Sequence, residues 1–506
     1  MEKVIAAEAD ALILHLEDSV PAELKVDARG IVQSKLAWLA GQKQRMVVRI
    51  KRDPHLYEFE DGARAAVQAE HNGPSDHNQE APMTEAPGGL PNNRRAARGA
   101  LHGLKVLDLS RVLAGPFAAQ ILADHGADVT KIEPPQGDET RELGPPFVGD
   151  SAAYFQGLNR NKRAISLDLS HPDGRQVLLR LLADADVLLE NFLPGTMKKW
   201  SLDYTDILQK RFPRLIYCSI SGFGDQGPLS SMPGYDAVLQ AFCGLMSING
   251  HRESGPTRIG IPIVDTAVGL SSVIGILLAV AERARSGMGQ HVGTSLFETA
   301  LSLLHPHPAN WFASGNTPGL TGNAHPNISP YDTFAAANGD VFIAVVNDGQ
   351  FKRFCDVIRR VELVADPRFS SNGSRVGNRN ALRTEIEPAL REIDATELCR
   401  RLTDAGVSAS RINSVADALQ HSHTLAREMV VELAGYKGVG IPVKLSRTPG
   451  SVRKAPPCFA ADTESVLREA GYDADATDAL VASGAAPKKN AKRRDVPRRT
   501  NLHTYR

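Results

Sequence analysis

The sequence of 506 residues predicts an α/β fold, in which a parallel sheet covered by helices is accompanied by a smaller α+β part. From residue 101 onward, short apolar segments of strand character alternate with helical segments through short connections, as in strand–helix–strand units. The content of 42% hydrophobic and 23% charged residues is that of an ordinary globular protein. This length corresponds to about two to four domains.

The first hundred residues differ from the rest in composition. Residues 1–64 predict an incomplete β/α unit, with strands over 11–14 and 46–50 and an amphipathic helix over 22–39. Residues 65–100 are rich in Pro, Gly, Asn and charge and have no apolar period, so we expect a disordered linker there.

The remaining chain divides by the same reasoning into a large domain with a smaller one inserted in it. We expect the large domain over 101–315, the smaller domain over 316–430, a return to the large domain over 431–484 and a disordered basic tail over 485–506. The expected strands are 105–109, 128–133, 187–189, 215–220, 340–346 and 441–444. Helices are expected over 117–125 and over the apolar stretch 268–281. The second is too short to span a bilayer, so we expect it to be a core helix.

Charge and cysteine content argue for a cytoplasmic protein that does not bind nucleic acid. The last 22 residues hold eight Lys or Arg and one Asp, which leaves 50 basic and 57 acidic residues, a net charge of −7, for the rest. The cysteines form no CxxC pair and are odd in number, which is typical of reduced, buried thiols in a reducing compartment such as the cytosol. They are Cys218, Cys243, Cys355, Cys399 and Cys458. The acidic N-terminus does not resemble a secretory leader, and no membrane contact is expected.

The loop after the first strand of the large domain contains one glycine and a proline, residues 115 and 116, so it lacks the glycine pattern of a dinucleotide-binding turn. A ligand that carries phosphate is still expected at the carboxyl edge of the sheet, where helices begin. The histidines show no metal-binding spacing, and no metal is expected.

Two aspartates precede apolar helices. For Asp236, after Pro233-Gly234-Tyr235, an N-cap is the favoured interpretation. For Asp265, spacing alone leaves two alternatives open. One is an N-cap, and the other is a carboxylate held at a helix N-terminus that acts as a nucleophile on an activated acyl carbon.

Several segments together resemble family III CoA-transferases, over about residues 101–484. They include 104–116 (LKVLDLSRVLAGP), 129–133 (VTKIE), 159–169 (NRNKRAISLDL), 190–195 (ENFLPG), 233–240 (PGYDAVLQ), 263–269 (IVDTAVG), 283–292 (RARSGMGQHV) and 325–334 (HPNISPYDTF). The resemblance implies a Rossmann-like large domain, an interlocked homodimer and an acyl-CoA thioester as substrate, with a small carboxylic acid as acceptor and no permanently bound cofactor.

The resemblance also implies roles for individual residues. Asp265 is then the nucleophile that forms a mixed anhydride and an aspartyl-CoA thioester. The residues that match CoA-binding or neighbouring positions are Arg111, Leu113, Ala114, Leu167, Asp168, Leu169, Ser170, Asn191, Phe192, Leu193, Lys199, Tyr235 and Asp236.

Some positions depart from the family pattern. Formyl-CoA transferase has basic residues where Pro134 and Pro233 stand, so phosphate anchoring must be rearranged; the alternatives are anchoring by Lys131, Lys162 or Arg163, or solvated surface charges at these positions. The racemase branch has a histidine where Tyr235 stands, and a phenol is a poor base near neutral pH. A racemase-like activity and a non-catalytic CoA-binding fusion protein are therefore the alternatives to a CoA-transferase.

Residues 1–64 resemble a truncated fragment of the citrate-lyase β-subunit and citramalyl-CoA lyase group, with His15 where that group usually has Asp. Two strands cannot close a barrel, so no lyase activity is expected. Because such lyases act on malyl- or citramalyl-CoA, the fusion suggests small dicarboxylates as substrates.

Overall fold

The computed structural model describes residues 11–15, 45–49 and 99–488, and the chain divides into two units, 1–92 and 93–506. In the first unit, β1 (Ala11–His15) and β2 (Arg45–Arg49) pair in parallel. The helix expected over 22–39, the linker up to residue 98 and the tail beyond 488 lie outside the described residues.

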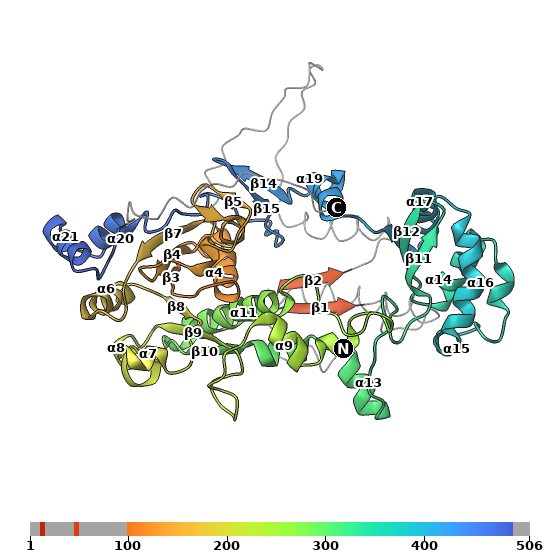
Figure 1. Cartoon of the computed structure of the whole chain (residues 1–506), viewed down its shortest axis with the longest axis horizontal. Helices are drawn as coiled ribbons and strands as arrows, with labels where there is room; N and C mark the ends of the chain where they lie inside the picture. Colours follow the sequence, from red (N-terminus) through yellow and green to blue (C-terminus); the bar gives the residue numbers. More distant parts are fainter. Residues whose placement is uncertain (1–10, 16–44, 50–98, 489–506) are drawn as a thin grey trace, which may run out of the picture. The chain divides into compact units, whose positions relative to one another are not determined.

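The second unit is built on a six-stranded sheet in which every neighbouring pair of strands is parallel, as the sequence predicts (Figure 1). The strand order is β10-β9-β8-β3-β4-β7. The strands are β3 (Lys105–Asp108), β4 (Asp128–Glu133), β7 (Lys162–Ser166), β8 (Val187–Glu190), β9 (Ile216–Ser221) and β10 (His291–Ser295).

Helices cover both faces of this sheet, so successive strand residues enter different cores. Val106 belongs to one apolar cluster and Leu107 to the other. The first cluster includes side chains of α4 (Ala114–Asp124), α9 (Asp236–Phe242), α11 (Ile263–Ser286) and α12 (Leu296–Ser302). The second includes side chains of α6 (Pro172–Leu182), α20 (Thr463–Glu469) and α21 (Ala474–Ala482).

The core helix expected over 268–281 is α11, which begins earlier and ends later. Val264, Val268 and Ile276 are completely buried in the first cluster. Leu270, Ile274 and Leu278 are exposed on the other side of the helix. By length and composition alone α11 is also long and apolar enough to cross a membrane.

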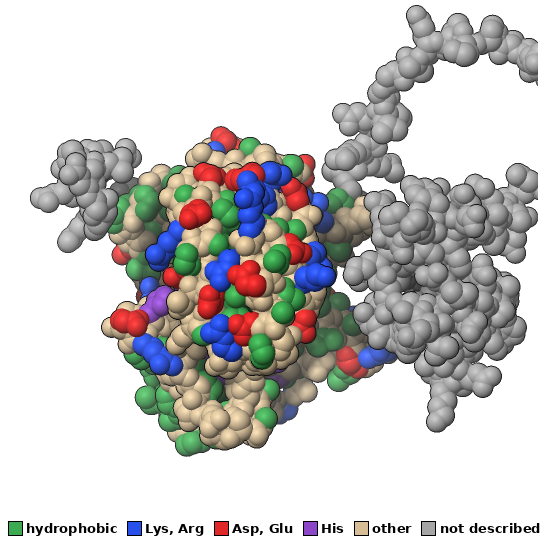
Figure 2. Space-filling model, turned by 90° about the vertical axis from the view of Figure 1, so that its right-hand side faces the viewer, with side chains coloured by type: hydrophobic (Ala, Val, Ile, Leu, Met, Phe, Trp, Pro, Cys, Tyr) green, Lys and Arg blue, Asp and Glu red, His purple; other side chains and the backbone are tan. Residues whose placement is uncertain are grey.

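A smaller antiparallel sheet has its own core. It consists of β11 (Tyr331–Ala336), β12 (Gly339–Ala344) and β13 (Ser408–Arg411), packed with α14 (Asp348–Val357), α16 (Arg379–Arg391) and α17 (Ala395–Asp404). Figure 2 views the molecule from the side on which α14–α17 lie, and basic side chains alternate there with acidic ones. Several of these charges are paired, as Arg400 is with Glu397 and Asp404.

The segment before the C-terminal helices differs from the expectation. The prediction of a strand over 441–444 is wrong, because these residues form no regular element. A hairpin of β14 (Val430–Leu433) and β15 (Tyr436–Val439) precedes them. Its loop residues Ala434 and Gly435 both have positive φ, which suits a tight two-residue turn. The folded core also continues beyond residue 484, since Ala485 and Ala486 are completely buried.

The remaining elements are short. They are η2 (Glu139–Arg141), β5 (Phe147–Val148), β6 (Ser151–Ala152), α5 (Ala153–Gln156), α7 (Thr196–Lys199), η3 (Tyr204–Leu208), α8 (Gln209–Arg211), α10 (Leu245–Ile248), α13 (His307–Ser314), η4 (Val361–Val364), α15 (Asn372–Gly377), α18 (Val415–Gln420) and α19 (Ser422–Ala426).

Candidate active site

The strand order has a switch point between β3 and β8. From β3 the chain adds β4 and then β7 on one side, and from β8 it adds β9 and then β10 on the other. Open α/β sheets bind ligands outside the carboxyl ends of the strands at such a point. The loops that leave β3 and β8 contain residues 111–114 and 191–193, two of the segments that the sequence resemblance assigns to CoA.

Side chains join these two loops directly. The Asn191 Oδ1 atom accepts a hydrogen bond from the Arg111 backbone N–H at 2.8 Å, and its Nδ2 atom donates to the Arg111 carbonyl oxygen at 2.8 Å. The Arg111 guanidinium also lies 5.4 Å from the centre of the Phe192 ring. Leu113 and Ala114 are buried where α4 begins, and Leu193 is exposed.

The segment 167–170 lies after the edge strand β7, so β4 separates it from β3. Leu167 and Leu169 are buried in the second cluster. The Asp168 Oδ1 atom accepts hydrogen bonds from the Ser170 N–H at 2.9 Å and hydroxyl at 2.6 Å, which keeps the pKa of Asp168 below its ordinary value. The same cluster includes Leu109, directly after β3, and Phe192, in the loop after β8, packs against it. Lys199 is exposed at the end of α7.

A glycine brings Asp265 to the loop after β3. Asp265 lies in the first turn of α11, and Gly269 follows one turn later on the same face. A Cβ atom added to Gly269 would lie 2.8 Å from the carbonyl oxygen of Ala114. The start of α11 therefore packs directly against the start of α4, next to residues 111–114.

Asp236 holds the N-terminus of α11. Its Oδ2 atom accepts hydrogen bonds from the backbone N–H groups of Val264 at 2.7 Å and Asp265 at 3.1 Å. Its Oδ1 atom accepts from Gln240 Nε2 at 2.6 Å, and Gln240 Oε1 accepts from the Ile259 N–H at 2.9 Å.

Both N-cap interpretations need correction. The residue at the N-cap of α11 is Pro262, so Asp265 lies inside the helix and does not cap it. Asp236 begins α9 but caps α11, and the N-cap residue of α9 is Tyr235, whose side chain is 66% exposed. Asp236 and Gln240 are four residues apart on one helix, a spacing that could have indicated their shared hydrogen bond.

The carboxylate of Asp265 lies in an unfavourable place for a charge. Burial raises the pKa of Asp265 to about 7, and the negative charge of Asp236 adds to this increase. In the described part of the chain, no side chain donates a hydrogen bond or forms an ion pair with it. Tyr154 on α5, which sequence reasoning did not identify, has its pKa raised by burial and by the charges of Asp265, Asp236 and Asp138.

The two lysines considered as phosphate anchors form buried ion pairs inside the protein. Lys131 Nζ lies 2.8 Å from Asp138 and Lys162 Nζ lies 2.9 Å from Asp108, and these four side chains are completely buried. Because they point into the protein, Lys131 and Lys162 are neither phosphate anchors nor surface charges.

Arg163 also has internal partners. It pairs with Asp128 at the start of β4 at 3.1 Å, and with Glu469 at 2.6 Å. It therefore lies at the opposite edge of the sheet from the loops after β3 and β8. Within residues 99–488 and the two N-terminal strands, no group of three or more His, Cys, Asp or Glu side chains could hold a metal ion.

Comparisons with known proteins agree on one family. The family model for CoA-transferase family III matches residues 101–463. A succinate–glutarate CoA-transferase of Agrobacterium fabrum is 38% identical over 73% of this chain and 95% of its own. An acetyl-CoA:oxalate CoA-transferase of Acetobacter aceti is 41% identical over 69% of this chain and 90% of its own. The crystal structure of a CaiB/BaiF family protein from Brucella suis is 40% identical, covers 74% of this chain and 100% of its own, and superposes with a TM-score of 0.67.

Proposed function

The chain belongs to CoA-transferase family III, and on that premise we propose that Asp265 is the nucleophile that carries CoA from a donor to an acceptor. Membership of this family makes the protein an enzyme that transfers CoA between an acyl-CoA and a carboxylic acid. The single observation that supports the role of Asp265 is a half-buried carboxylate without a described cationic partner, packed beside the loop at the switch point of the sheet.

In the proposed mechanism each step exchanges one acyl bond for another. A carboxylate oxygen of Asp265 attacks the thioester carbonyl carbon, the C–S bond breaks, and a mixed anhydride and CoA thiolate form. The thiolate attacks the aspartyl carbonyl carbon of the anhydride, which releases the donor acid and leaves an aspartyl-CoA thioester. The acceptor carboxylate repeats these two steps in reverse order, so that the acceptor leaves as its CoA thioester and Asp265 is regenerated.

The partial burial of Asp265 supports this role in physical terms. A carboxylate removed from water has lost part of its hydration, so less solvent must be displaced before it attacks. The cap that Asp236 provides fixes the backbone of residues 264 and 265 and thereby orients the nucleophile.

We propose that residues 111–114 and 191–193 bind the CoA moiety, with 167–170, Lys199, Tyr235 and Asp236 as further positions carried over from the family. The shared bonds between Arg111 and Asn191 support the first two segments as one surface. CoA enters as part of the substrate, and the proposal includes no permanently bound cofactor.

Asp265→Asn tests the nucleophile. We expect the freshly prepared variant to lose at least about 1,000-fold in kcat, because an amide cannot form the anhydride. Wild-type enzyme incubated with succinyl-CoA and then hydroxylamine should carry a hydroxamate at Asp265 by mass spectrometry, and the variant should carry none. Full turnover by Asp265→Asn would overturn the assignment.

We propose small dicarboxylates as the substrate class, since both relatives named above act on dicarboxylic acids. With succinyl-CoA as donor, we expect kcat/KM for glutarate, oxalate, malate and itaconate to exceed that for propionate and butyrate by about 10-fold or more, the effect of one charged contact. Equal values for the two groups would contradict this class. Deuterium exchange at the α-carbon without any acceptor would instead indicate a racemase-like activity.

We also propose that the enzyme is a cytoplasmic homodimer. The exposed apolar side of α11 supports a second copy as its cover, because this helix is otherwise part of the core.

A further inference from the structure

Val112 has a strained backbone in the middle of the loop at the switch point. Its φ is +67°, in the left-handed region that side chains branched at Cβ rarely adopt. Among the described non-glycine residues with positive φ, it is the one with a β-branched side chain. Strain of this kind persists where the surroundings hold it, and it is concentrated at binding and catalytic sites.

Buried side chains contact the backbone just before Val112 and at Val112 itself. The Ser110 N–H donates to Asp108 Oδ1 at 3.0 Å, and the Ser110 carbonyl oxygen accepts from Lys131 Nζ at 2.9 Å. At Val112 itself, the N–H lies 3.5 Å from Asp138 Oδ1, the acceptor that the structure gives it.

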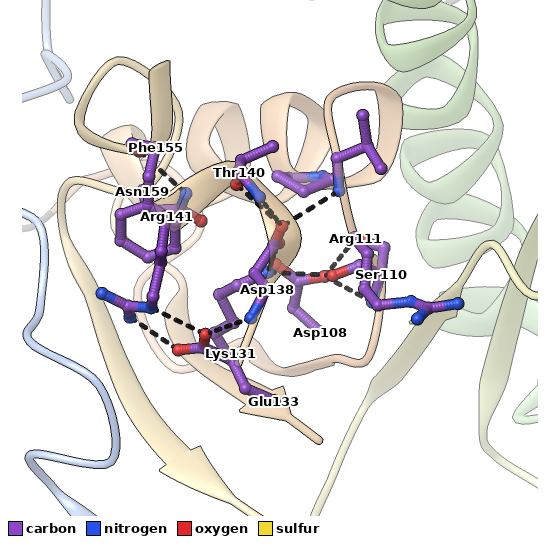
Figure 3. A network of polar contacts seen from close by, with 12 residues as sticks. Asp108, Ser110, Arg111, Lys131, Glu133, Asp138, Thr140, Arg141, Phe155 and Asn159 are labelled. Carbon is purple, nitrogen blue, oxygen red and sulfur yellow. Dashed lines mark hydrogen bonds and ion pairs between the residues drawn. The ribbon is translucent and has the colours of Figure 1, made fainter. Parts of the chain in front are cut away.

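Asp138 is fixed in turn by its neighbours, as Figure 3 shows. Its Oδ2 atom lies 2.8 Å from Lys131 Nζ, and both side chains are completely buried. Its Oδ1 atom accepts from Thr140 N–H at 3.0 Å and from the Thr140 hydroxyl at 2.7 Å, and its own N–H donates to Glu133 Oε2 at 2.8 Å.

We propose that the Asp138–Lys131 pair is a positioning device that holds Val112 in its left-handed conformation and so keeps residues 111–114 in the shape that binds acyl-CoA. This inference rests on the proposed function, because it assigns CoA to that loop. Asp138 and Lys131 touch no reacting atom in this proposal and act only through the backbone of the loop.

Loss of the pair would change which backbone conformation of Val112 is most populated. Without its partners Val112 would favour negative φ by about 5- to 30-fold, the bias that an L-residue shows against the left-handed region. If only the left-handed state binds, the apparent affinity for CoA falls by the same factor. Glycine lacks this bias, so Val112→Gly should make the loop much less dependent on the pair.

The experiment measures the Kd of CoA by calorimetry, the KM of acyl-CoA and of the acceptor, and the melting temperature in the full chain. Asp138→Ala removes the acceptor of Val112. Lys131→Met with Asp138→Ala removes both charges and guards against an unfolded single variant, since replacing a whole buried pair is tolerated better than breaking one.

Asp124→Ala is the matched control. Asp124 forms a comparably buried pair with Arg160 at 2.7 Å, but at the other end of α4, about 15 Å from the loop at 1.5 Å of rise per residue. It should lower the melting temperature and leave both KM values within about 2-fold of wild type.

We expect Asp138→Ala and the double variant to raise the Kd of CoA and the KM of acyl-CoA about 10-fold, with the acceptor KM unchanged. Adding Val112→Gly should restore both constants to within about 3-fold without restoring the melting temperature. A wild-type-like Kd in both variants, or no rescue by Val112→Gly, would overturn the inference while leaving the proposed function intact. A wild-type protein that neither binds CoA nor transfers it would overturn the proposed function, and this inference with it.

Discussion

Two effects raise the pKa of Asp265: its partial burial, which is the larger effect, and the negative charge of Asp236. Asp236 has two effects that oppose each other for catalysis. It fixes the first turn of α11 through Val264 and Asp265, but its charge also favours the protonated, non-nucleophilic form of Asp265. The pKa of the proposed nucleophile is therefore raised by a neighbour that also positions it.

This arrangement predicts a pH dependence. Because the proposed nucleophile acts as the ionised carboxylate, kcat/KM for the donor should rise with pH and level off above an apparent pKa of about 7. In Asp236→Asn the like charge is gone, so the rise should occur at lower pH, while the weaker cap lowers the plateau by about 10-fold. The pH profile of kcat/KM for the donor measures both effects.

Asp225→Asn is the control for this profile, because Asp225 is exposed in the preceding glycine-rich turn and is no cause of the pKa shift of Asp265. Its profile should coincide with that of wild type. An unchanged midpoint in Asp236→Asn would contradict the electrostatic part of this account.

At the level of whole elements, the contact between α4 and α11 decides where Asp265 lies. Gly269 allows α11 to approach the Ala114 carbonyl, and Gly115 allows α4 to begin beside Ser110, where an added Cβ would lie 2.3 Å from the serine side chain. Two glycines thus bring the first turns of two helices to the same edge of the sheet.

Gly269→Ala should therefore impair catalysis although it touches no substrate. The new Cβ would lie 2.8 Å from a backbone oxygen, which cannot rotate away, so α11 must shift and carry Asp265 with it. A displacement of several tenths of an ångström to 1 Å should lower kcat/KM about 10- to 100-fold. Steady-state kinetics and the melting temperature would be measured together.

Gly275→Ala in the same helix provides the matched comparison, since its Cβ would lie 2.5 Å from the Cγ1 atom of Val292, so the atom that must move belongs to a side chain and not to the backbone. It should leave kcat/KM near wild type and lower stability by about 1–3 kcal/mol, because the overlap with Val292 must be relieved. Equal losses in both variants would show that the position of Gly269 is not special.

The same elements show how much the sequence could predict. The strands β3, β4, β8 and β9 follow apolar runs and were expected within a residue or two at each end. The strand β7 was not expected, because it begins with Lys162 and Arg163. Lys162 can be buried in a strand only because it pairs with Asp108, 54 residues earlier. In the site, Asp265 was identified through family resemblance, whereas its cap by Asp236 depends on the packing of α9 against α11 and has no local signal.

At the scale of the whole molecule, the outer side of α11 remains to be explained. Leu270, Ile274 and Leu278 recur at four-residue spacing and form one exposed apolar stripe on a helix whose other side is in the core. A stripe of this kind requires a cover, which the homodimer proposed above would supply. The same helix is long and apolar enough for a membrane, so the two explanations need an experiment that separates them.

Light scattering after size exclusion in detergent-free buffer makes that separation. We expect wild-type protein at about twice the chain mass of 54.5 kDa. Ile274→Glu, which places a charge on a side chain that is 59% exposed in the single chain, should shift the mass to one chain, because burying an unpaired carboxylate in an interface costs several kcal/mol. Val361→Glu, at a position that is 58% exposed on η4, should remain dimeric. A wild-type monomer would refute the dimer, and a wild-type protein recovered only with detergent would favour the membrane as the cover of α11.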